Sequence, residues 1–109
     1  MSVALADAIC AALPGAQRSL RAEGEIEGWK IGGKLFAIYG RRGGGVSVKT
    51  ADTATARMLI DAGEAVRAPY VHASWVRLEW PADPEALRHR LLVSYDIVRA
   101  GLPKALRGD

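Results

Sequence analysis

The chain has 109 residues, of which half are hydrophobic and a quarter are charged. This is the usage of one ordinary globular domain, and it excludes a disordered or low-complexity protein. A single cysteine excludes an intramolecular disulfide, no apolar stretch approaches a membrane span, and the net charge of +3 permits a nucleic-acid partner without requiring one. We expect one domain over residues 1–109 and a cytoplasmic location.

The N-terminal segment, residues 2–13, carries apolar side chains at helical spacing and predicts a helix that ends at Pro14–Gly15. Asp7 lies inside this apolar run and no basic region precedes it, so we expect a short helix rather than a signal peptide. Cys10 lies on the apolar side of the helix, and we expect a buried thiol. A short strand is predicted around residues 18–21.

A β-hairpin is the clearest pattern in the chain. Two strand-like runs, Ile26–Ile31 and Lys34–Tyr39, flank Gly32–Gly33, which is typical of a two-residue hairpin turn. In the register that this turn gives, Trp29 faces Phe36. We therefore expect an aromatic pair between the two strands on the core side.

The remaining elements follow in a regular order. The sequence predicts a turn over residues 40–45 (GRRGGG), a strand over 46–49, a helix over 53–62 capped by Thr50 or Asp52, a connector over 64–70, a strand over 74–80 and a helix over 84–100. The order, with hairpin-length loops between strands, indicates an α+β protein with an antiparallel sheet and helices packed on one face.

The predicted elements after residue 50 have clear faces. In the helix over 53–62 the expected inner residues are Ala54, Met58, Leu59 and Ala62. In the strand over 74–80, Trp75, Arg77 and Glu79 point one way, whereas Val76, Leu78 and Trp80 point the other way, toward the core. In the last helix the expected core residues are Leu87, Leu91, Tyr95 and Val98.

Five basic residues are the candidate binding residues. Lys30 and Lys34 flank the first hairpin turn, Arg41 and Arg42 lie in the second turn, and Lys49 ends the strand that follows. Such side chains contact phosphate oxygens. We expect the cations of the two hairpin tips to gather into one ridge. The plainer interpretation of the second turn is a solvent-exposed glycine-rich tip without a ligand.

The sequence gives little support to metal binding or to nucleophilic catalysis. His72 and His89 lie on different elements without further ligands at zinc-binding spacing, and no serine has a nucleophile-elbow pattern. We therefore expect no enzyme, no metal and no cofactor. Glu23, Glu25 and Glu27 alternate and predict a solvated strand edge that repels nucleic acid. Trp75 could stack on a base, although most aromatic residues of a small domain belong to its core.

Four segments resemble the MmcQ/YjbR family when they are taken together. They are GWKIGGKLFAIYG, VSVKT, APYVHASWVRLEW and LRHRLLVSYDIVRAGLPKALR, in this order, and the resemblance spans roughly residues 1–107. It implies an α+β fold similar to the CyaY-like (frataxin-like) architecture and DNA binding through a double-wing motif. The family offers no catalytic residues to carry over.

Two functions remain open at this point. The first is a small protein that binds DNA through basic hairpin wings, with non-specific phosphate contacts, because the tips lack Asn or Gln that could read adenine. The second is a protein-interaction or adaptor domain, monomeric or weakly homodimeric, that uses an edge strand or the face of Trp75 and has no nucleic-acid role.

Overall fold

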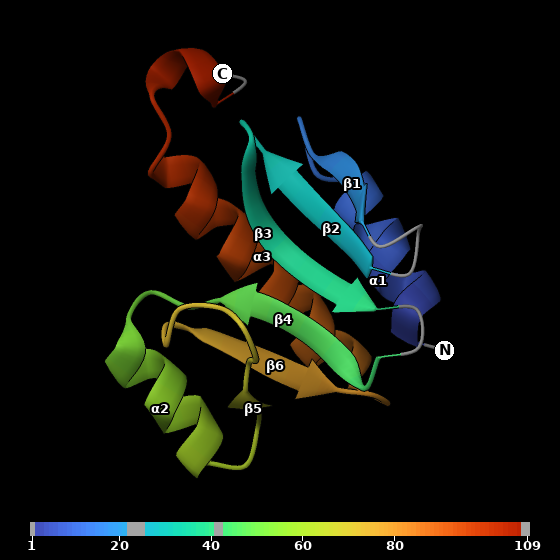
Figure 1. Cartoon of the computed structure of the whole chain (residues 1–109), viewed down its shortest axis with the longest axis vertical. Helices are drawn as coiled ribbons and strands as arrows, with labels where there is room; N and C mark the ends of the chain where they lie inside the picture. Colours follow the sequence, from blue (N-terminus) through green and yellow to red (C-terminus); the bar gives the residue numbers. More distant parts are fainter. Residues whose placement is uncertain (1, 22–25, 41–42, 108–109) are drawn as a thin grey trace.

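The computed structural model describes residues 2–21, 26–40 and 43–107, which form one antiparallel sheet and three α-helices (Figure 1). The strands lie in the order β1-β2-β3-β4-β6-β5. In chain order the elements are α1 (Ser2–Ala11), β1 (Gln17–Arg21), β2 (Ile26–Ile31), β3 (Lys34–Gly40), β4 (Gly45–Lys49), α2 (Thr53–Asp61), β5 (Val66–Arg67), β6 (Trp75–Glu79), α3 (Pro84–Ala100) and a short 3-10 helix (Lys104–Leu106).

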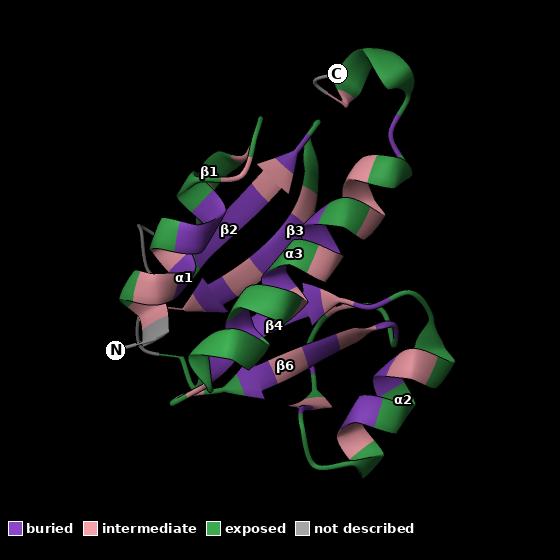
Figure 2. Cartoon of the chain, turned by 180° about the vertical axis from the view of Figure 1, so that it is seen from behind, coloured by how far each residue is buried: buried purple, intermediate pink, exposed green. Residues whose placement is uncertain are grey.

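The helices pack on one face of the sheet (Figures 1 and 2). Helix α3 lies across β3 and β4, α1 packs beside α3, and α2 packs against β5 and β6 at one side of the sheet. The buried apolar side chains form one cluster between the sheet and these helices. The predicted α+β class with helices on one face is confirmed.

Most predicted boundaries are close to the observed ones, and the caps explain why. Asp52 accepts a hydrogen bond from the Thr55 main chain at 2.7 Å and begins α2, and Asp83 accepts one from Ala86 at 3.0 Å and begins α3. Gly63 follows α2 with a φ of +77°, which suits glycine. The connector predicted over residues 64–70 contains the two-residue strand β5, too short for a periodic signal.

The predicted inner face of α2 is wrong in part. Leu59 is buried as expected, but Met58 is 62 % exposed and Ala54 and Ala62 are exposed, whereas Ala56 is buried. Residues 54, 58 and 62 form one stripe of the helix, and residues 56, 59 and 60 form another. Docking against β5 and β6 selects the second stripe, which the sequence of this small-residue helix does not distinguish from the first.

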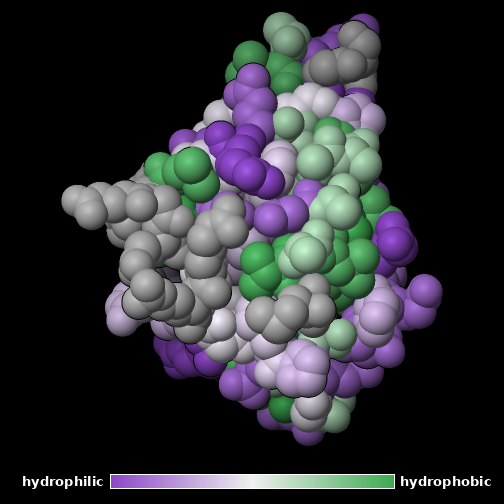
Figure 3. All heavy atoms as spheres, turned by 90° about the vertical axis from the view of Figure 1, so that its right-hand side faces the viewer, coloured by the Kyte–Doolittle hydropathy of each residue, from purple (hydrophilic) through white to green (hydrophobic). Residues whose placement is uncertain are grey.

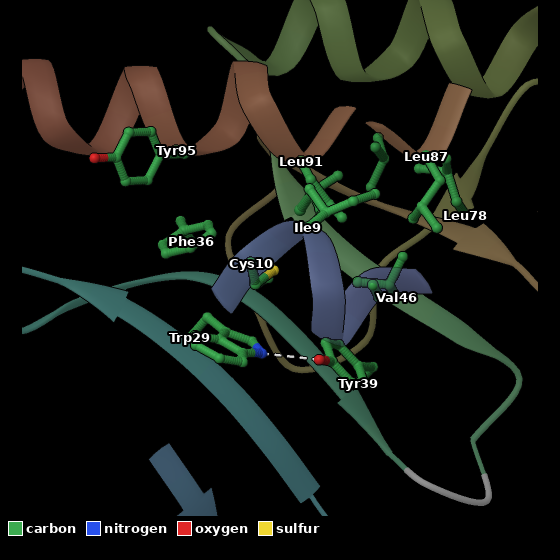
Figure 4. Packing of buried hydrophobic residues seen from close by; sticks show 14 of the residues in the cluster. Ile9, Cys10, Trp29, Phe36, Tyr39, Val46, Leu78, Leu87, Leu91 and Tyr95 are labelled. Carbon is green, nitrogen blue, oxygen red and sulfur yellow. Dashed lines mark hydrogen bonds between the residues drawn. The ribbon is translucent and has the colours of Figure 1, made fainter. Parts of the chain in front are cut away.

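The expected Trp29–Phe36 pair is also wrong, because β3 bulges. Ile31 faces Lys34 as predicted, but the register shifts by one residue, so that Trp29 lies opposite Ala37. The indole of Trp29 instead donates a hydrogen bond to the Tyr39 hydroxyl at 2.8 Å (Figure 4). Phe36 packs edge-on against Tyr95 of α3, with ring centroids 5.4 Å apart.

The prediction that Glu27 lies on a solvated strand edge is wrong. This residue is fully buried and lies between Leu20 of β1 and Tyr39 of β3. Because β1 pairs along the whole of β2, the edge of the sheet is β1 and not β2. Glu23 and Glu25 lie outside the described residues.

Candidate functional site

The face of the sheet away from α1 and α3 carries a group of basic and aromatic side chains. Strand alternation places them there, because the flanking residues are buried against the helices. The side chains are Lys30, Lys49, Trp75 and Arg77, and the buried neighbours are Trp29, Ile31, Val48, Val76 and Leu78. We call these four residues the basic sheet face. In Figure 1 the strands that carry it lie in front of α1 and α3.

Strand pairing brings three of the four residues into one row. Lys49 lies directly opposite Trp75 on the neighbouring strands β4 and β6. Lys30 lies at the same end of the sheet, two strands away on β2, which places its main chain roughly 10 Å from that of Lys49. Arg77 follows Trp75 on the same face of β6, opposite Ser47. All four side chains are partly exposed.

Lys49 is held in place by two hydrogen bonds to serine hydroxyl groups. Its main-chain N–H donates to the Ser94 hydroxyl at 2.9 Å, and its ammonium group donates to the Ser74 hydroxyl at 3.1 Å. Ser74 in turn contacts Nδ1 of His72, through its hydroxyl at 2.9 Å and its main-chain N–H at 3.1 Å. Because an ammonium group has three donors, two N–H groups of Lys49 stay available to an anion.

Arg77 already makes one contact within the protein. Its Nη2 lies 3.5 Å from Oε2 of Glu79, an exposed pair that contributes little stability. Its Nε is buried and has no hydrogen-bond partner within the described residues. Among the described strand residues, Glu79 is the one carboxylate on this face, against three cations. The basic sheet face is therefore net positive.

Three of the five candidate basic residues lie in the described part of the chain. The structure brings Lys30 and Lys49 together on the basic sheet face. Lys34 is exposed at the hairpin turn, but it pairs with Ile31, which is buried on the helix side. Arg41 and Arg42 lie outside the described residues.

The single ridge expected from the two hairpin tips stays a prediction, because Arg41 and Arg42 of the second tip lie outside the described residues. The first turn precedes Lys34 at the start of β3, and the second turn follows Gly40 at its end. These two ends of β3 are roughly 20 Å apart. The cations that do come together lie on strands, on the open face of the sheet.

The sequence identified the alternation of Trp75 and Arg77 but not their place in the site. β6 is separated from β4 in the chain by α2 and β5, yet the two strands are neighbours in the sheet. No local pattern predicts this pairing. Only the pairing shows that Lys49 and Trp75 share one surface.

Other surfaces and groups offer less to an anion. The side of the molecule that carries α1 shows hydrophobic residues among hydrophilic ones in Figure 3, and Asp7 is the single charged residue of that helix. A hollow of about 760 Å³ lies between α2, β5 and the start of α3, with both acidic and basic side chains at its rim. Among residues 2–21, 26–40 and 43–107, no group of three or more His, Cys, Asp or Glu could hold a metal ion. No helix in that part of the chain is long and apolar enough to cross a membrane.

The buried polar groups under α1 do not make a nucleophile. Burial, reinforced by the nearby charge of Asp7, raises the pKa of the Cys10 thiol to about 12. Burial and a hydrogen bond to Asp7 raise the pKa of Tyr39 well above its ordinary value. Arg18 completes the group, with its guanidinium 5.0 Å from the ring centre of Trp29. The Cys10 thiol and the Tyr39 hydroxyl therefore stay protonated at neutral pH, and the hydrogen bond from Tyr39 to Asp7 joins β3 to α1.

The comparisons with known proteins agree with this fold. The family model named YjbR matches residues 11–97. Among solved structures, the crystal structure of the Deinococcus radiodurans protein DR2400, described with a DUF419 domain, superposes with a TM-score of 0.75. The two chains are 19 % identical, and the match covers 92 % of this chain and 80 % of the other. No curated protein matches the chain.

Proposed function

The chain belongs to the YjbR family, and from the geometry of its open sheet face we propose that it is a small nucleic-acid-binding protein. In this proposal Lys30, Lys49 and Arg77 contact phosphate oxygens. The observation that supports it most directly is that these three cations, with Trp75, share a sheet face that neither α1 nor α3 covers. The protein would act in the cytoplasm, without a metal or a cofactor and without catalysis.

The held position of Lys49 supports a binding role. An anchored ammonium loses less side-chain entropy on contact with a phosphate than a free one, so a pre-oriented lysine binds more tightly. The contacts would be to phosphates, which position a nucleic acid without reading its sequence. We therefore expect low sequence specificity and an affinity that falls steeply with salt.

A salt titration tests the proposal. Fluorescence anisotropy of labelled DNA and RNA oligonucleotides is followed between about 50 and 200 mM salt. The double variant Lys30→Gln with Lys49→Gln should bind more weakly and reduce the slope of log K against log salt by about one for each lysine. Arg88→Gln removes an exposed cation from α3, on the opposite side of the sheet, and is the matched control. No binding at low salt, or equal losses in both variants, would reject the proposal.

The hairpin tips are tested in the same assay. Lys34→Gln probes the first turn, and Arg41→Glu with Arg42→Glu probes the second. If the wings add phosphate contacts, these variants lower the salt slope further. If they leave the slope unchanged, the strands alone carry the binding.

One observation favours the alternative of a protein-interaction domain. β1 is an edge strand of the sheet, and Leu20 on it is 57 % exposed. Such an edge can pair with a strand of a partner or of a second copy. Light scattering after size exclusion discriminates: a dimer that forms with rising concentration, is lost in Leu20→Lys and ignores nucleic acid would favour this alternative.

A further inference from the structure

We infer that the basic sheet face takes single-stranded rather than double-stranded nucleic acid, and that Trp75 stacks on one of its bases. This inference rests on the proposed function for its phosphate contacts. It adds the strand state of the ligand and a contact that phosphates alone cannot make.

The width of the sheet argues against a duplex groove. Six strands about 4.8 Å apart span roughly 24 Å, whereas the major groove is about 12 Å wide and admits a helix or a two-stranded ribbon. Lys30 and Lys49 lie on β2 and β4, which are both inside the sheet and not at its edge. A duplex could touch such a face only through its outer phosphates.

Trp75 gives the face a partly exposed aromatic ring, on which the stacked bases of a duplex cannot stack. Its indole is partly exposed on the open side, and its main-chain N–H is fixed by the carbonyl of His72 at 2.9 Å. In a duplex the bases stack on each other, but a single strand offers free base faces that stack on aromatic side chains. Trp80 cannot do the same, because it follows β6 on the core side and packs against the buried cluster.

The cations lie where they can contact phosphates of the same nucleic-acid strand whose base stacks on Trp75. Lys49 is directly opposite Trp75, so a base on the indole brings its own backbone toward the ammonium group. Arg77 is the next residue on this face of β6, about 7 Å along the strand, and Lys30 continues the row toward β2. A base platform flanked by phosphate contacts on two sides is the arrangement that single-strand binding sites use.

Three ligands of equal length separate stacking from charge. They are an oligothymidylate, an abasic oligomer with the same number of phosphates, and a DNA duplex. We expect the oligothymidylate to bind about 5- to 150-fold more tightly than the abasic oligomer, which corresponds to one stacked base, and to quench tryptophan fluorescence. Equal affinity for all three without quenching overturns the inference but leaves the proposed phosphate binding intact. No binding of any ligand at low salt removes the proposed function as well.

Variants then assign the stacking residue. Trp75→Ala should lower the affinity for oligothymidylate to that for the abasic oligomer and leave the abasic affinity unchanged. Trp75→Phe keeps an aromatic ring, guards against loss of folding, and should retain part of the preference while it removes the quenching. Trp80→Phe should keep both the preference and the quenching. Quenching that persists in Trp75→Phe and vanishes in Trp80→Phe would contradict the assignment.

Discussion

The hydroxyl group of Ser94 on α3 donates a hydrogen bond to the main-chain carbonyl oxygen of Phe36 on β3 at 2.6 Å. The same hydroxyl accepts the main-chain N–H of Lys49 on β4 at 2.9 Å. Phe36 is the extra residue of the bulge, and the β3–β4 ladder stops at the pair Ala37–Val48. A helix side chain thus bridges the two strands where their own hydrogen bonds end, and it fixes the main chain of a residue of the basic sheet face.

Replacing this bridge should destabilise the protein. Ser94 is fully buried, so Ser94→Ala leaves the Phe36 carbonyl and the Lys49 N–H without a partner and without water. We expect the free energy of unfolding to fall by about 1–3 kcal/mol, measured by urea denaturation. Ser19→Ala, on the edge strand β1, is the control and should change it by less than about 0.5 kcal/mol. Similar losses of unfolding free energy for both serines would show that the hydrogen bonds of Ser94 contribute no more to stability than the hydroxyl group of Ser19 does.

Substitution by alanine should destabilise the protein at Gly45 and be tolerated at the neighbouring Gly44. A Cβ at Gly45 would lie 2.2 Å from the carbonyl oxygen of Leu78 on the paired strand β6, and main-chain atoms there cannot move aside. Gly45→Ala should therefore cost roughly 1–3 kcal/mol or more. At Gly44 the nearest atom is Nη2 of Arg77, at 3.6 Å, which is an ordinary contact. Thermal unfolding of both variants checks this, and a stable Gly45→Ala protein would contradict the close strand approach.

The contrast between what sequence could and could not predict follows from the range of each interaction. The stripe of Leu87, Leu91 and Tyr95 on α3 is a periodic pattern within one element, and all three side chains are buried as expected. The bulge at Phe36 adds one residue without any change of composition, so the hairpin pattern does not reveal it. Glu27 became interior only because β1 pairs beside it.

The candidate site could likewise be predicted from the sequence only in part. Lys30 and Lys49 were recognisable as basic residues on predicted strands. Their convergence with Trp75 depends on β6 lying next to β4, which is a contact between segments far apart in the chain. The turn sequences favoured the hairpin tips as the binding residues, because exposed glycine-rich turns with cations are visible locally, whereas a shared sheet face is not.

The Cys10 thiol should be unreactive in the folded protein. It is fully buried, and a pKa raised to about 12 leaves roughly one thiolate in ten thousand at pH 8. We expect a disulfide reagent to label the native protein only at the rate of its opening, and to label the protein in urea at once. Rapid labelling of the native protein at pH 8 would show that α1 does not stay packed on the sheet.

Asp52 should make the start of α2 sensitive to acid. Hydrogen bonds from the side chain and then the main chain of Thr55 lower the pKa of Asp52 below its ordinary value of 3.8. Because the folded pKa is lower than the unfolded one, the stabilisation is fully present above the unfolded value and is lost as pH falls through the folded value.

Three proteins compared by thermal unfolding between about pH 3 and pH 7 isolate this contribution from other carboxylates. Asp52→Ala should melt at a lower temperature than the parent protein at neutral pH, and the gap should shrink toward pH 3. Asp52→Asn keeps a capping oxygen that does not titrate, so its gap from Asp52→Ala should stay constant. A gap between the parent and Asp52→Ala that is independent of pH would mean that the carboxylate charge plays no part in capping α2.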